Sequence, residues 1–101
     1  MSELKFVVVK ISDLRHITVL RQRILGVDCL DGDSDSNTKH FAVFQTSGGS
    51  LYGGAVGCAS FMLDYSQGKP IWNLRGFAVD LEFIGKGVAE LLYDKFPKFF
   101  P

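Results

Sequence analysis

The chain has 101 residues, of which 47% are apolar and 22% are charged, and its eleven basic side chains balance its eleven acidic ones. This composition excludes a disordered chain and predicts a single globular domain, over residues 1–101, with a compact core. Because no net charge attracts nucleic acid or anionic lipid, neither is expected as a partner, and any anion site must be local.

Cysteine spacing and the N-terminus predict a cytoplasmic protein without a metal ion. Cys29 and Cys58 lack the spacing of a metal site, so both are expected to be free thiols. Residues 1–5 do not have the pattern of a signal peptide, and no apolar run is long enough to span a bilayer. We therefore expect no membrane association.

The first two predicted elements are a strand and a helix. Residues 4–11 include three consecutive valines and are too short for a helix, which favours a buried strand. Ser12 is a suitable N-cap, and apolar residues then recur at helical spacing until Gly26. An amphipathic helix of about three to four turns is expected here.

A polar loop follows over residues 27–39, where Asp, Ser and Asn predominate. Aspartates at 31, 33 and 35 resemble part of a calcium loop, but its glycine and closing glutamate are missing from the required positions. Turn formation explains the same residues and is the favoured interpretation.

Three strands are predicted next. Residues 40–46 and 51–63 flank the turn sequence 47–50 and predict an antiparallel hairpin. A further strand is expected over residues 71–79, interrupted at Gly76.

A second helix is predicted from Gly87 to near Phe96, because Pro97 must end or kink it. The resulting order is β-α-β-β-β-α. We therefore expect an α+β fold with a mostly antiparallel sheet of about four strands and two main helices.

The turn at residues 84–89 carries the strongest chemical signal. Gly85 and Gly87 permit positive φ and leave room for a ligand, so the backbone N–H groups can point inward toward phosphate oxygens. The helix that follows adds the positive end of its dipole, and Lys86 adds a cation. Many strand-to-helix turns use such glycines for geometry alone, so the motif by itself does not establish phosphate binding.

Four segments together resemble the GNAT superfamily of N-acetyltransferases. Residues 84–89, Ile-Gly-Lys-Gly-Val-Ala, are similar to its [QR]-x-x-G-x-[GA] turn at the glycine and the final small residue. Residues 74–79 resemble its Leu-Arg-Gly-Met-Ala strand, residues 20–25 resemble its first helix, and residues 57–59 resemble its third strand.

The resemblance implies an acetyl-CoA-dependent N-acetyltransferase acting on a small-molecule or peptide amine. The turn amides of Gly85, Lys86, Gly87, Val88 and Ala89 would hold the CoA pyrophosphate. The backbone of Phe77, Ala78 and Val79 would pair with the pantetheine arm beside a bulge at Gly76, and a strand N–H would polarise the thioester carbonyl.

Two departures from the family pattern keep alternatives open. Ile84 replaces the usual Gln or Arg. The chain also lacks the strands and helix that follow in the family, which complete its CoA groove and often supply a Tyr that acts as general acid. One alternative is a catalytically inactive relative that binds CoA or a protein partner. Another is a dimeric structural domain whose glycine turn has no ligand.

No catalytic residue is assigned with these alternatives open. Asp80 and Glu82 are base candidates that are interpreted as solvated carboxylates, and His40 is interpreted as a strand-end surface residue. His16 is placed on a polar helix face. Cys58 and Trp72 are interpreted as core residues.

The C-terminal residues 95–101, Lys-Phe-Pro-Lys-Phe-Phe-Pro, are unfavourable in water, and the strand at 71–79 would be an open sheet edge. A homodimer in which two edges or two tails cover each other is therefore predicted.

Overall fold

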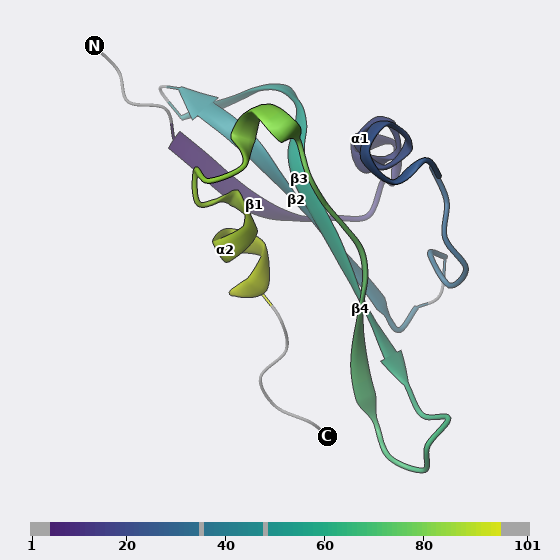
Figure 1. Ribbon diagram of the computed structural model, residues 1–101. Helices are drawn as coiled ribbons and strands as arrows, with labels where there is room; N and C mark the ends of the chain where they lie inside the picture. The colour runs from purple at the N-terminus through teal and green to yellow at the C-terminus, as the bar shows by residue number, and fades with distance from the viewer. Residues whose placement is uncertain (1–4, 35, 48, 96–101) are drawn as a thin grey trace.

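The computed structural model describes residues 5–34, 36–47 and 49–95, and it confirms the predicted α+β order (Figure 1). Its elements are β1 (Lys5–Ile11), α1 (Arg15–Leu25), β2 (Thr38–Ser47), β3 (Ser50–Asp64), β4 (Ile71–Val79), a 3-10 turn η1 (Leu81–Phe83) and α2 (Val88–Tyr93). The four strands form one antiparallel sheet in the order β1-β2-β3-β4. The β2–β3 pairing is the predicted hairpin, whereas β1 reaches β2 through α1 and the loop that follows it.

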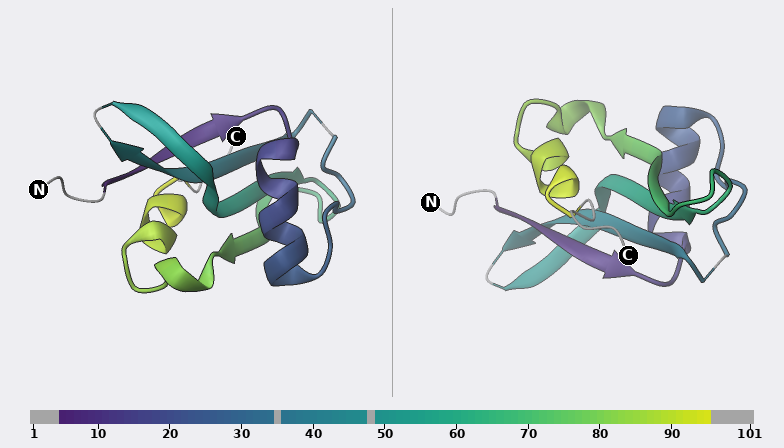
Figure 2. Two further views of the ribbon diagram at one scale, coloured as in Figure 1. Left: turned by 90° about the horizontal axis from the view of Figure 1, so that it is seen from above. Right: turned by 90° about the horizontal axis from the view of Figure 1, so that it is seen from below.

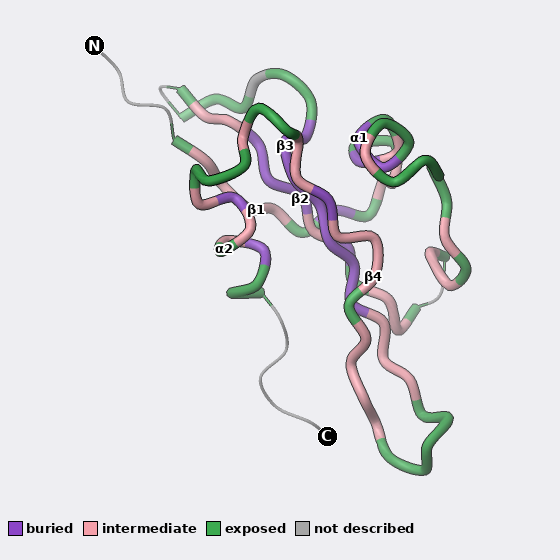
Figure 3. The backbone as a smooth tube through the Cα atoms, viewed as in Figure 1, coloured by how far each residue is buried: buried purple, intermediate pink, exposed green. Residues whose placement is uncertain are grey.

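The two helices cover opposite faces of the sheet, and side chains alternate between them along each strand. On β2 and β3, Ala42, Phe44 and Cys58 belong to the core cluster under α1, whereas Val43 and Ala59 belong to the cluster under α2. Figure 2 shows α1 and α2 on either side of β3 and β4. Burial is concentrated along β2 and β3, while the far end of the β3–β4 hairpin is largely exposed (Figure 3).

The start of α1 differs from the sequence prediction. Ser12 is not the N-cap: the helix begins at Arg15, and Leu14 occupies the cap position without a side-chain hydrogen bond. Instead, the Arg15 N–H donates to the carboxylate of Asp13 at 3.0 Å. The Asp13 carboxylate thus satisfies one of the amides that the first turn of a helix leaves unpaired. Gly26 ends the helix at φ 78°, as predicted.

The second helix is shorter than predicted. α2 has six residues and ends at Tyr93, well before Pro97. The predicted end near Phe96 and most of the predicted dimerising tail lie outside the described residues, so the homodimer stays a prediction. Neither helix in the described part of the chain has the length and apolar character needed to cross a bilayer.

A β-bulge interrupts β4 at the predicted glycine. Cys58 pairs with Ala78 and Ser60 pairs with Arg75, so β4 contains one more residue than β3 between these pairs. Gly76 lies in this extra stretch at φ 59°, a left-handed conformation that favours glycine.

A buried polar cluster lies beneath the bulge and corrects the interpretation of His40. The Arg21 guanidinium, on a fully buried side chain, donates to Asp33 at 2.7 Å and to the Ser60 hydroxyl at 2.9 Å. His40 is only 5% exposed, with Nδ1 2.6 Å from the Ser60 hydroxyl and Nε2 2.8 Å from the Asp33 carbonyl oxygen. A Cβ at Gly76 would lie 3.0 Å from Arg21 Nη2, so the guanidinium fills the space under the bulge.

Arg21 of α1 therefore connects the loop that contains Asp33 to Ser60 of the sheet. Burial acts to raise the pKa of Asp33, but the hydrogen bonds from Arg21 and from the Leu30 N–H outweigh it, and the pKa lies below its usual value. Within the described ranges, no three metal-binding side chains gather, and Asp35 lies outside those ranges.

The Cys58 thiol should make stability fall at alkaline pH. Cys58 is fully buried, and burial raises its pKa from 9.0 to about 11. Above pH 9 the unfolded chain loses this proton and the folded chain keeps it. The free energy of unfolding should therefore fall by about 2 kcal/mol between pH 9 and 11, measurable by urea denaturation.

Cys58→Ala is the control for this effect, because alanine is also small and apolar but does not titrate. The difference in unfolding free energy between the parent chain and Cys58→Ala should change across this pH range. If both proteins lose stability in parallel, the lysines and tyrosines are the cause and the assignment to Cys58 is wrong.

Candidate functional site

The glycine turn leaves most of its backbone amides unpaired. Gly85 and Gly87 both adopt left-handed conformations, at φ 82° and 88°. The Lys86 N–H donates to the Phe83 carbonyl oxygen at 3.3 Å. Within the described part of the chain, the N–H groups of the two glycines, Val88 and Ala89 have no acceptor, and no side chain caps the turn. These amides are available to an anionic ligand.

An open pocket of about 350 Å³ adjoins this turn and is called the turn pocket below. Six of the eight residues predicted to bind the cofactor line it: Phe77, Ala78, Val79, Gly85, Gly87 and Ala89. Lys86 is exposed and does not line the pocket. The Val88 side chain points into the core, where its Cγ1 would lie 2.5 Å from a Cβ at Gly57, so Val88 can offer only its amide.

The edge of β4 offers a further pair of backbone groups. The Asp80 N–H donates to the Val56 carbonyl oxygen at 2.8 Å, and Val79 is paired with Gly57. Because successive residues of an antiparallel strand point their backbone groups alternately toward and away from the partner strand, those of Val79 point to the open edge. No described strand pairs with that edge. Ala78, by the same alternation, bonds back to β3 and cannot hold a ligand through its backbone.

Two features of this region were not predicted from the sequence. Phe77 stacks on Tyr93, with ring centroids 5.0 Å apart and planes 18° apart, and this contact joins the bulge of β4 to α2. Because α2 has only six residues, its dipole adds little and the loop amides must supply most of the attraction for an anion.

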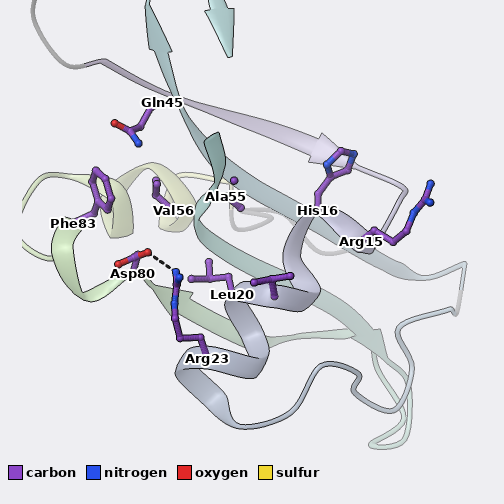
Figure 4. A pocket seen from close by; sticks show the side chains of 11 residues that line it. Arg15, His16, Leu20, Arg23, Gln45, Ala55, Val56, Asp80 and Phe83 are labelled. Atoms are coloured by element: carbon purple, nitrogen blue, oxygen red, sulfur yellow. Dashed lines mark hydrogen bonds and ion pairs between the residues drawn. The ribbon is translucent and has the colours of Figure 1, made fainter. Parts of the chain in front are cut away.

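A second pocket, of about 430 Å³, lies between α1, the start of β3 and the end of β4, and is called the α1–β3 pocket (Figure 4). An ion pair between Arg23 of α1 and Asp80 borders it. Asp80 also accepts the Glu82 N–H at 3.1 Å, and its side chain is only 19% exposed. The interpretation of Asp80 as a solvated carboxylate is therefore wrong, whereas Glu82 is exposed.

The other two candidate site residues, His16 and Trp72, do not line the turn pocket. His16 is exposed, as predicted, at the rim of the α1–β3 pocket and against the edge of Phe44. Trp72 is half-buried against the core under α2, and the Lys39 ammonium lies 5.2 Å from its ring centroid. Trp72 borders neither pocket.

Comparison with known proteins supports the fold assignment. No protein-family model and no curated protein matches the chain. A solved structure of a GCN5-related glucosamine N-acetyltransferase region in a fungal multi-domain GH3 beta-N-acetylglucosaminidase superposes with a TM-score of 0.68 at 23% identity. The match covers 93% of this chain and 12% of that one. The chain therefore has a GNAT-like α+β fold.

Proposed function

We propose that the turn pocket binds acetyl-CoA and that the protein transfers its acetyl group to an amine. The unpaired amides of Gly85 and Gly87, beside a pocket that ends on the open edge of β4, carry this proposal. Amides of this kind bind phosphate oxygens without a basic surface, which suits a chain of zero net charge.

The residues that border the turn pocket fit successive parts of the acetyl-CoA molecule. The turn amides and the nearby Lys86 cation suit the pyrophosphate, and the outward N–H and C=O of Val79 suit the amide groups of the pantetheine arm. Acetyl-CoA supplies a thioester-activated acetyl group. The GNAT-like fold supports the general kind of reaction. Because the similar fungal region is named a glucosamine N-acetyltransferase, glucosamine belongs among the amines to be tested.

The inactive relative remains the second candidate, because one observation favours it. Asp80, the base candidate closest to β4, forms an ion pair with Arg23 and also accepts the Glu82 N–H. Such a protein would bind acetyl-CoA without turning it over.

Two measurements separate these candidates. Calorimetric titration with acetyl-CoA is expected to show saturable binding to the 101-residue chain. A thiol-release assay across an amine panel that includes glucosamine then tests transfer. Binding with no thiol release would favour the inactive relative, and absence of acetyl-CoA binding would contradict both candidates.

A further inference from the structure

The α1–β3 pocket is separate from the turn pocket, and its charges predict a different ligand. We propose that it binds a small amine that also carries an anionic group, with Asp80 receiving the ammonium and Arg23 receiving the anion. The role of this ligand as the acetyl acceptor rests on the proposed function, whereas its binding does not.

The Arg23–Asp80 ion pair can exchange its partners. One terminal nitrogen of Arg23 contacts one oxygen of Asp80, and the side chain of Arg23 is 55% exposed. Asp80 is the sole acceptor of Arg23 among the residues described, so several of its five N–H donors face solvent. Because the Arg23 side of this single contact is exposed to solvent, the ion pair contributes little free energy, and separating it to admit a ligand costs little.

A ligand that carries both charges should gain more binding free energy in this pocket than a ligand that carries one. A lone ammonium must compete with Arg23 for Asp80, and a lone anion must compete with Asp80 for Arg23. A ligand with both charges replaces one ion pair with two. Figure 4 shows Arg23 reaching from α1 to Asp80 at the end of β4.

The remaining wall of the pocket suits a short, partly apolar ligand. Leu20, Ala55 and Val56 are buried and apolar, and Gly54 adds no side chain. The volume of about 430 Å³ lies in the range of small-molecule sites. Phe83 lines both pockets, and Asp80 directly follows Val79 of the turn pocket. An amine held by Asp80 would therefore lie next to the proposed cofactor.

Site-resolved NMR titration of the full chain, at constant ionic strength, tests the proposal. The probes are β-alanine and phosphoethanolamine, which carry both charges, and ethylamine and propionate, which carry one each. We expect the first two to bind at least about tenfold more tightly than the last two, with shifts at the amides of Leu20, Ala55 and Asp80. The ratio between β-alanine and phosphoethanolamine distinguishes a carboxylate from a phosphate ligand.

Variants of the ion pair give opposite expectations for the two kinds of probe. Arg23→Gln should weaken β-alanine binding about tenfold while ethylamine, facing an unpaired Asp80, binds as well or better. Asp80→Asn should weaken β-alanine similarly and favour propionate. Lys69→Gln, on the exposed turn before β4, removes a charge outside both pockets and should change neither affinity.

Several results would overturn the proposal. They are equal affinities for all four probes, shifts confined to residues 84–89, or a loss in Lys69→Gln as large as in Arg23→Gln. The last result would show a general positive potential, since Lys69 lies outside both pockets. Acetyl-CoA titration of the same sample reports separately on the turn amides, so failure of the proposed function is distinguishable from failure here.

Discussion

Replacement of Arg21 by methionine is expected to lower the free energy of unfolding by about 3–5 kcal/mol. Methionine fills much of the same space, but it leaves the half-buried Asp33 carboxylate without its cation and removes the hydrogen bond from Arg21 to the buried Ser60 hydroxyl. A small domain has about 5–15 kcal/mol of stability in total, so this loss is a large fraction of it. Urea denaturation followed by circular dichroism measures it.

Arg15→Met is the matched control, because Arg15 also contacts an aspartate at 2.7 Å but is 89% exposed. Exposed ion pairs contribute at most about 1 kcal/mol, so this variant should lose far less stability. Similar losses in the two variants would show that burial does not decide the contribution of Arg21. Partial recovery in the double variant Arg21→Met, Asp33→Leu would identify the uncompensated charge as the cause.

The position of this cluster links stability to the candidate site. Arg21 lies directly under Gly76, and the bulge at Gly76 precedes the residues of β4 that line the turn pocket. Loss of the guanidinium would leave a void beneath the bulge. We therefore infer that Arg21 positions the edge of β4 as well as stabilising the fold.

Local patterns predicted the sheet well. The bounds of β4, the bulge at Gly76 and the turn at residues 84–89 agree with the sequence analysis, since glycines and β-branched or aromatic residues specify conformation within a few residues. The end of α2 at Tyr93 was missed, because its apolar spacing continues beyond the residues that pack on the sheet.

Contacts between distant residues could not be predicted in the same way. Arg23 and Asp80 are 57 residues apart, and Arg21 and Ser60 are 39 residues apart. Each side chain alone has the pattern of a solvated surface residue. His40 was misplaced for the same reason, because the polar loop that covers it contributes no apolar signal to the sequence.

Replacement of Gly87 by alanine should weaken acetyl-CoA binding at least about tenfold. Gly87 adopts φ 88°, and alanine there costs about 1–2 kcal/mol unless the backbone rotates away. Nothing in the protein crowds the new methyl group, since the nearest atom of Glu90 lies 3.6 Å from it. The turn can therefore relax, and relaxation would redirect the amides that the proposal assigns to the pyrophosphate. Losing one or two charge-assisted hydrogen bonds gives the expected change in affinity.

Gly68→Ala separates this effect from simple loss of stability. Gly68 adopts φ 79° with nothing within 4 Å of a Cβ, but it lies in the turn before β4 and lines neither pocket. Both variants should therefore lose similar stability in urea, and only Gly87→Ala should lose affinity in calorimetric titration. If the two variants bind acetyl-CoA equally well, the amides around Gly87 do not hold the cofactor. The likeness of fold would then remain without the proposed binding site.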